Sequence, residues 1–134
     1  MRAKLTLLLL ALALVPAASA AVGIKATLKA PAANPVVNVK WPYSIKVTDL
    51  KGKPVKGTFT GVVIDPFGGV HPNDYGPSEP LVPLTNWPIK GTFRDYMIFP
   101  PTSRGFLLTL KWTIKVKIAG KTYKKVLTRK VTPG

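Results

Sequence analysis

The stretch FLLTLKWTIKVKI, which runs from Phe106 to Ile118, decides the fold of this 134-residue chain. Apolar residues occupy every second position of the stretch, and threonine or lysine fills most of the positions between them. Because neighbouring side chains of a strand point to opposite faces of a sheet, this period of two predicts a long strand with one buried and one solvated face. Such one-sided strands are typical of antiparallel sheets.

The same alternation recurs on both sides of this stretch. After a turn at Ala119-Gly120-Lys121 we expect the chain to return as a hairpin strand up to Thr132, although neither face of that strand is cleanly apolar. Prolines and glycines leave little room for a helix beyond residue 20. Pro42 lies inside one alternating run, so that strand either breaks at Pro42 or has Pro42 at an open edge. The other expected strands cover residues 22–28, 41–48, 55–64 and 90–99.

About seven short strands in a domain of roughly 100 residues predict an all-β fold, an immunoglobulin-like antiparallel β-sandwich. Residues 40–49 followed by Gly52-Lys53-Pro54-Val55 resemble the second and third strands of bacterial exported immunoglobulin-like or fibronectin-III-like domains, where a strand ends in D-x-x-G-x-P-V. Gly91-Thr92-Phe93 and the long strand with its hairpin resemble the closing strands of the same domains. The resemblance implies an adhesion, spacer or accessory module. Metal-binding relatives carry several His or Met ligands, which this chain lacks.

The first twenty residues have the pattern of a cleavable secretory signal peptide. Arg2 and Lys4 precede the apolar run from Leu5 to Val15, and Ala18-Ser19-Ala20 supplies the small residues of a cleavage site. A helix of that apolar run would span about 16 Å, roughly half of a bilayer core, so the run is too short for a permanent anchor. We therefore expect one mature domain, residues 21–134, without a transmembrane segment, that is secreted, extracellular or held in the cell envelope.

Charge and cysteine content narrow the possible functions. The chain has 20 basic and 5 acidic residues and a formal charge of +15, which becomes +13 when Arg2 and Lys4 leave with the signal peptide. Such an excess attracts polyanions, and outside a cell these include anionic polymers of the envelope. The absence of cysteine excludes disulfides, thiolate metal sites and a cysteine nucleophile. The fold must therefore be held by packing.

Lysines on the solvated face of the long strand and on its hairpin partner form the first candidate site. Residues two apart on a strand lie about 7 Å from each other, so such a row can follow an anionic polymer. The same lysines can instead serve only to keep strand edges from pairing with other chains. Trp112 has inward parity, so we expect no specific nucleic-acid binding by base stacking. The candidate ligand-binding residues are Lys111, Lys115, Lys117 and Lys124.

The proline-rich segment 66–88 is the second candidate site. Tyr75 and Trp87, if exposed, are anchors of the kind that dominate protein interfaces, which makes protein recognition the alternative function. Residues 81–84 are expected to form a short strand or a buried staple inside this segment.

Acidic residues at the same segment raise a third possibility. Asp65, Asp74 and Glu79 are candidate ligands of Ca²⁺, which takes six to eight oxygen ligands. The alternative is that these residues only form turns, with side chains bonded to their own backbone. A bound Ca²⁺ would suit a calcium-dependent accessory or enzyme domain.

No catalytic motif accompanies these sites. Ser78 or Ser103 can be combined with His71 and Asp95 on paper, but the chain has no G-x-S-x-G nucleophile elbow. In the pair Arg94-Asp95, alternation directs one charged side chain toward the core or a sheet edge. We therefore expect a non-enzymatic binding or structural module that needs no cofactor, with an anionic envelope polymer or another exported protein as its partner.

Overall fold

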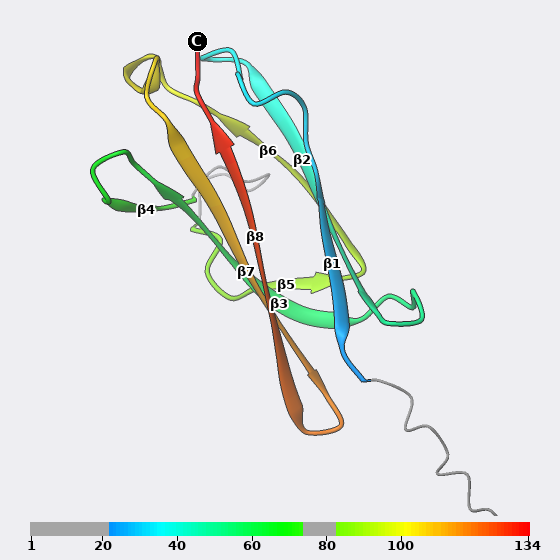
Figure 1. Ribbon diagram of the computed structural model, residues 1–134. Helices are drawn as coiled ribbons and strands as arrows, with labels where there is room; N and C mark the ends of the chain where they lie inside the picture. Colours follow the sequence, from blue (N-terminus) through cyan, green and yellow to red (C-terminus); the bar gives the residue numbers. More distant parts are fainter. Residues whose placement is uncertain (1–21, 74–82) are drawn as a thin grey trace, which may run out of the picture.

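The computed structural model describes residues 22–73 and 83–134 (Figure 1). This part of the chain is almost entirely β-structure, with one short 3₁₀ turn, Pro101–Ser103, and the prediction of an all-β fold is confirmed. The proposed signal peptide lies outside the described residues. The strands are β1 Ile24–Lys29, β2 Lys40–Asp49, β3 Lys56–Ile64, β4 Val70–Pro72, β5 Trp87–Lys90, β6 Thr92–Ile98, β7 Leu108–Ile118 and β8 Lys121–Val131.

Two antiparallel sheets form the sandwich. One sheet has the strand order β1-β2-β6, and the other has the order β4-β3-β7-β8. Strand β5 also pairs with β3, at Lys56–Phe59, whereas β4 pairs with the far end of β3 at Val62–Ile64. These two short strands lie in or next to the proline-rich segment, and with the six longer strands they make eight in the described residues, where about seven were expected.

The core lies between the inward faces of β2 and β7. On β7 the buried side chains are Leu108, Leu110, Trp112, Ile114 and Val116, as the period of two predicts. On β2 they are Trp41, Tyr43, Ile45 and Val47. The rings of Tyr43 and Trp112 meet across the two sheets with centroids 5.1 Å apart. Large side chains from both sheets therefore interdigitate in one core.

Strand β7 begins later than its sequence pattern predicts. Phe106 and Leu107 precede the strand and are exposed, although the alternation assigns Phe106 to the buried face. The amide of Gly105 donates to the Pro133 carbonyl, and the amide of Phe106 donates to the Ser103 carbonyl. The chain is thus held in a turn at the end of the sandwich and enters the sheet only at Leu108.

Pro42 does not break its strand. Strand β2 is continuous through Pro42, and its pairing with β1 ends at Ser44. Pro42 therefore lies beyond the last β1 pair, where a missing amide donor leaves no β1 carbonyl unsatisfied. This matches the second of the two expected arrangements.

Strand β8 is an edge strand that is covered at its C-terminal end. The amides of Thr132 and Gly134 donate to the carbonyls of Ala33 and Pro35, so the segment after β1 runs parallel to the end of β8. The inward face of β8, ambiguous in the sequence, carries Tyr123, Leu127 and Val131.

Asp95 is the charged residue of its pair that turns toward the core, while Arg94 is exposed. The Tyr43 hydroxyl donates to Asp95 Oδ2 at 3.3 Å. Burial raises the pKa of the Asp95 carboxyl above its ordinary value, and burial together with the nearby Asp95 raises the pKa of Tyr43. A titratable pair thus lies inside a core that is otherwise largely apolar.

Close contact between β3 and β7 depends on Gly57. A Cβ at this position would collide with the Lys115 carbonyl oxygen and come within 2.7 Å of Val116 Cγ2. We expect Gly57→Ala to lower the free energy of unfolding by about 1–3 kcal/mol, because the two strands must separate. Gly23→Ala is the matched control, since a Cβ there meets Leu50 at an ordinary 3.5 Å. Equal midpoints for both variants in chemical denaturation would contradict this explanation.

Asp95 should make the stability of the fold depend on pH. A carboxyl whose pKa is raised by folding contributes stability that is complete below its unfolded pKa, about 3.9, and is lost as pH rises through the folded value. Asp95→Asn keeps an acceptor for Tyr43 and removes this titration. The chain with Asp95 should therefore lose stability relative to Asp95→Asn as pH rises. The difference between their free energies of unfolding should change by up to about 1.4 kcal/mol per pH unit. Denaturation curves from mildly acidic to neutral pH test this, and parallel pH profiles would contradict it.

Candidate functional site: a lysine face and an apolar end

The outward face of the β3-β7-β8 sheet carries a set of lysines that we call the lysine face. Lys115 is opposite Lys124 on β8 and Thr58 on β3, so the register places the lysines of β7 on one surface with Lys124 and Lys130 of β8. Every member is exposed except Lys111, which is partly buried. The members of the lysine face are Lys56, Lys90, Lys111, Lys115, Lys117, Lys124 and Lys130.

Like charges are direct neighbours on this face. Lys115 and Lys124 are Cα partners across β7 and β8, and Lys56 and Lys90 are Cα partners across β3 and β5. Opposed Cα atoms in antiparallel strands lie about 4.5–5.5 Å apart, and like charges placed directly opposite destabilise a sheet. The lysine face thus retains an electrostatic cost that the fold does not require.

Acidic residues of the described chain do not neutralise the lysine face. Asp49 accepts from the amides of Lys51 and Lys53 in a turn, and Asp95 is buried on the opposite sheet. Asp65 Oδ2 contacts His71 Nε2 at 2.8 Å, and no lysine or arginine forms a salt bridge within residues 22–73 and 83–134. The positive charge of the lysine face is therefore uncompensated within that part of the protein.

The outward face of the β1-β2-β6 sheet is basic in a different way. Lys25 lies opposite Thr48, Lys46 opposite Thr27, and Lys29 opposite Ser44. Each of these cations faces a hydroxyl residue and not another cation. Repulsion between directly opposed charges is thus a property of the lysine face and not of this second surface.

All four lysines expected as ligand-binding residues, Lys111, Lys115, Lys117 and Lys124, lie on the lysine face. Other basic residues of β8 do not join them: Lys121, Lys125 and Arg129 have the opposite parity, and Arg129 Nη2 donates to the Pro31 carbonyl.

Of the two residues expected as protein anchors, only Trp87 lies within the described residues. Trp87 is partly buried and packs against the core beside Phe59, so little of the ring remains for a partner. Tyr75 lies outside the described residues, as do Asp74 and Glu79. Leu84 is buried, and its carbonyl accepts from Gly61, so the expected buried staple is present at this residue.

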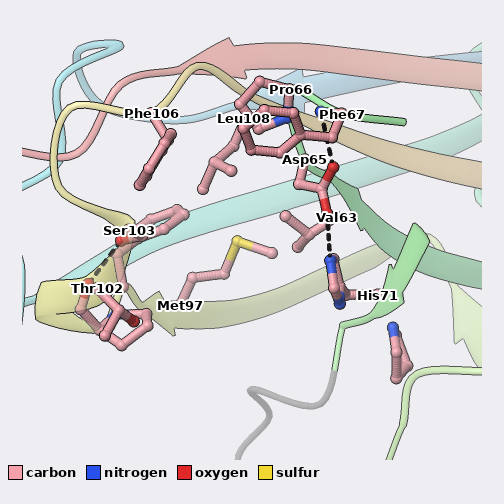
Figure 2. Close-up of a pocket in the computed structure, with 13 residues that line it drawn as sticks. Val63, Asp65, Pro66, Phe67, His71, Met97, Thr102, Ser103, Phe106 and Leu108 are labelled. Carbon is pink, nitrogen blue, oxygen red and sulfur yellow. Dashed lines mark hydrogen bonds and ion pairs between the residues drawn. The ribbon is translucent and has the colours of Figure 1, made fainter. Parts of the chain in front are cut away.

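A cavity of about 520 Å³ opens at the end of the sandwich where β3 leads into β4 and β6 leads into β7 (Figure 2). Met97, Phe99 and Leu108 form apolar parts of its wall, and Phe67 and Phe106 stand at its opening. The sequence pattern did not reveal this cavity, because its walls come from strand ends and loops that are far apart in the sequence. An aromatic residue in the turn Pro66-Phe67-Gly68-Gly69 is the one local signal.

Asp65 organises the turn that holds Phe67. Its Oδ1 accepts from the amides of Phe67 and Gly69 at 2.9 and 2.8 Å, and its Oδ2 contacts His71 Nε2 (Figure 2). These hydrogen bonds, led by that from His71, hold the pKa of Asp65 below its ordinary value. Asp65 is therefore a turn residue, as the alternative to the calcium hypothesis expects. Residues 22–73 and 83–134 contain no group of three or more potential metal ligands.

Comparisons with protein families, curated proteins and solved structures find no match to this chain. No helix within residues 22–73 and 83–134 is long and apolar enough to cross a membrane.

The turn around Phe67 gives a test of Asp65. Asp65→Ala should remove the protection of the Phe67 and Gly69 amides against hydrogen exchange, because both donate to its carboxylate. His71→Ala leaves those two bonds in place, and we expect it to change exchange at these amides far less. The same loss of protection in both variants would show that the contact between Asp65 and His71 is what holds the loop.

Proposed function

We propose that this chain is an exported, non-enzymatic binding module whose lysine face binds an anionic polymer of the cell envelope. The observation that carries the proposal is the direct pairing of like charges across strands, Lys115 with Lys124 and Lys56 with Lys90, none of which forms a salt bridge with a carboxylate of the described chain. A polyanion laid across the sheet supplies the missing negative charge and relieves the repulsion.

The spacing of the lysines suits a repeating anion. Lys115 and Lys117 are two residues apart on one strand, about 7 Å, and Lys124 lies about 5 Å from Lys115 across the hairpin. A flexible polymer with a charge in each repeat can contact several of these ammonium groups together. Binding of this kind releases counterions, so its affinity falls steeply with salt.

Removal of three ammonium groups tests the proposal. Lys115→Ser, Lys117→Ser and Lys124→Ser, combined in one variant, should weaken binding to dextran sulfate by at least about tenfold at low salt. The slope of log affinity against log salt should become shallower at the same time. Fluorescence titration or calorimetry measures both, with neutral dextran as the blank.

The matched control removes the same charge from the other sheet. Lys25→Ser, Lys29→Ser and Lys46→Ser together leave the lysine face intact, and we expect them to weaken binding much less. Equal losses in the two triple variants would mean that net charge, and not this face, governs binding. Neither variant changes a buried residue, so a thermal melt suffices to show that both are folded.

One substitution separates binding from stability. Lys124→Thr removes a directly opposed like charge, so we expect the free energy of unfolding to rise slightly, on the order of 0.3 kcal/mol in low salt. Affinity for dextran sulfate should fall in the same variant. A chain that loses stability and affinity together would argue that Lys124 has a structural role.

A further inference from the structure

Exposed apolar side chains gather at one end of the sandwich. Three segments contribute two each: the β1–β2 connection, the β3–β4 turn with the first residue of β4, and the approach to β7. Figure 1 shows the first and third of these segments at the end where the C-terminus lies, and the cavity brings the β3–β4 turn beside the third. The residues are Val36, Val39, Phe67, Val70, Phe106 and Leu107.

Phe67 is the most prominent of them. Its side chain is 87% exposed at the tip of the β3–β4 turn, and its ring meets Phe106 edge-on with centroids 6.4 Å apart. The Phe67 amide is held by Asp65, so the ring stands on an ordered turn. An exposed aromatic pair at the opening of an apolar cavity is unfavourable in water and marks a surface that an apolar partner covers.

Cations flank these apolar residues. Lys40 follows Val39 directly, and Arg104 precedes Phe106 and Leu107 by a glycine; both cations are exposed. The carboxylate described at this end, Asp65, is hydrogen-bonded to His71 and to the amides of Phe67 and Gly69. Exposed apolar side chains with exposed cations next to them in the chain match an anionic lipid surface, which has acyl chains beneath phosphate headgroups.

We propose that this end of the protein docks on the surface of a bilayer that contains anionic lipid. Phe67, Phe106 and Leu107 enter the boundary between headgroups and acyl chains, about 5–10 Å deep, and Arg104 and Lys40 remain among the phosphates. Charge complementarity favours a lipid surface over an apolar protein groove. When the apolar side chains are covered, Arg104 and Lys40 beside them need anionic partners, which lipid phosphates supply and an apolar groove does not.

Docking through this end leaves the lysine face accessible. The β7–β8 hairpin, which carries Lys117 and Lys124 near its turn, lies at the opposite end of the sandwich (Figure 1). The domain then stands on the membrane with the β7–β8 hairpin directed away from the bilayer and the lysine face along its side. The lipid contact does not depend on the proposed function, since it uses other residues and another ligand.

A fluorescent reporter tests the contact directly. Phe67→Trp places an indole at the apolar tip, and Val126→Trp places one at an exposed position of β8 as the matched control. The probe is a vesicle of phosphatidylcholine with roughly one third phosphatidylglycerol. We expect the emission of the Phe67→Trp chain to move to shorter wavelength and to be quenched by lipid-attached quenchers. The Val126→Trp chain should show neither change.

Affinity measurements complete the test. Phe67→Ser with Leu107→Ser should weaken vesicle binding at least about tenfold, whereas Val126→Ser should leave it unchanged. Arg104→Gln should weaken binding to the anionic vesicle and not to phosphatidylcholine alone. All variants are compared in the same full-length chain, so any contribution from residues 1–21 is common to them.

Three results would overturn the proposal. The first is no association with anionic vesicles at low salt, which would leave a protein as the occupant of this end. The second is quenching at Val126→Trp and not at Phe67→Trp, which would show that a sheet face lies on the lipid. The third is a loss of vesicle binding in the Lys115, Lys117 and Lys124 triple variant with no loss in the Phe67 and Leu107 double variant.

Discussion

The contact between Trp112 of β7 and Tyr43 of β2 joins the two sheets, and the rest of the structure depends on it. The chain has no cysteine, so no covalent bond can hold the sheets together, and their stability comes from close packing. Gly57 and Gly61 on β3 make room for this packing by letting β7 and the side chain of Trp112 approach. The buried pair of Tyr43 and Asp95 lies beside the same contact, which couples the core to pH.

This core also determines what the protein can present to its surroundings. The inward positions of β7 are taken by apolar residues, and therefore the lysines of this strand share the outward face, where the register adds Lys56 of β3 and Lys124 and Lys130 of β8. Loops at one end leave six apolar side chains outside the core, with cations beside them. The molecule thus has two chemically distinct surfaces, one suited to a polyanion along a sheet and one suited to an apolar, anionic boundary at its end.

Much of the fold follows from local pattern. The alternation in β2 and β7 predicts which residues are buried, and the turn at Ala119-Gly120 predicts the hairpin. Other features depend on distant neighbours and could not be predicted: β4 and β5 are short strands held by β3 amid prolines. Phe106 continues the apolar period of β7 but lies outside the sheet, because the amide of Gly105 donates a hydrogen bond to the carbonyl of Pro133 near the C-terminus.

The sequence by itself determined an all-β sandwich, because side chains of a strand alternate between two faces whatever the strand's partners are. It also determined that the lysines of β7 lie opposite the core. Only the tertiary structure decided that Lys124 joins them while Lys125 does not, and that Lys115 and Lys124 meet directly, since cross-strand register depends on pairing. Only the tertiary structure brought Phe67 and Phe106 together at one end, because two loops far apart in the chain meet there through the packing of the sheets.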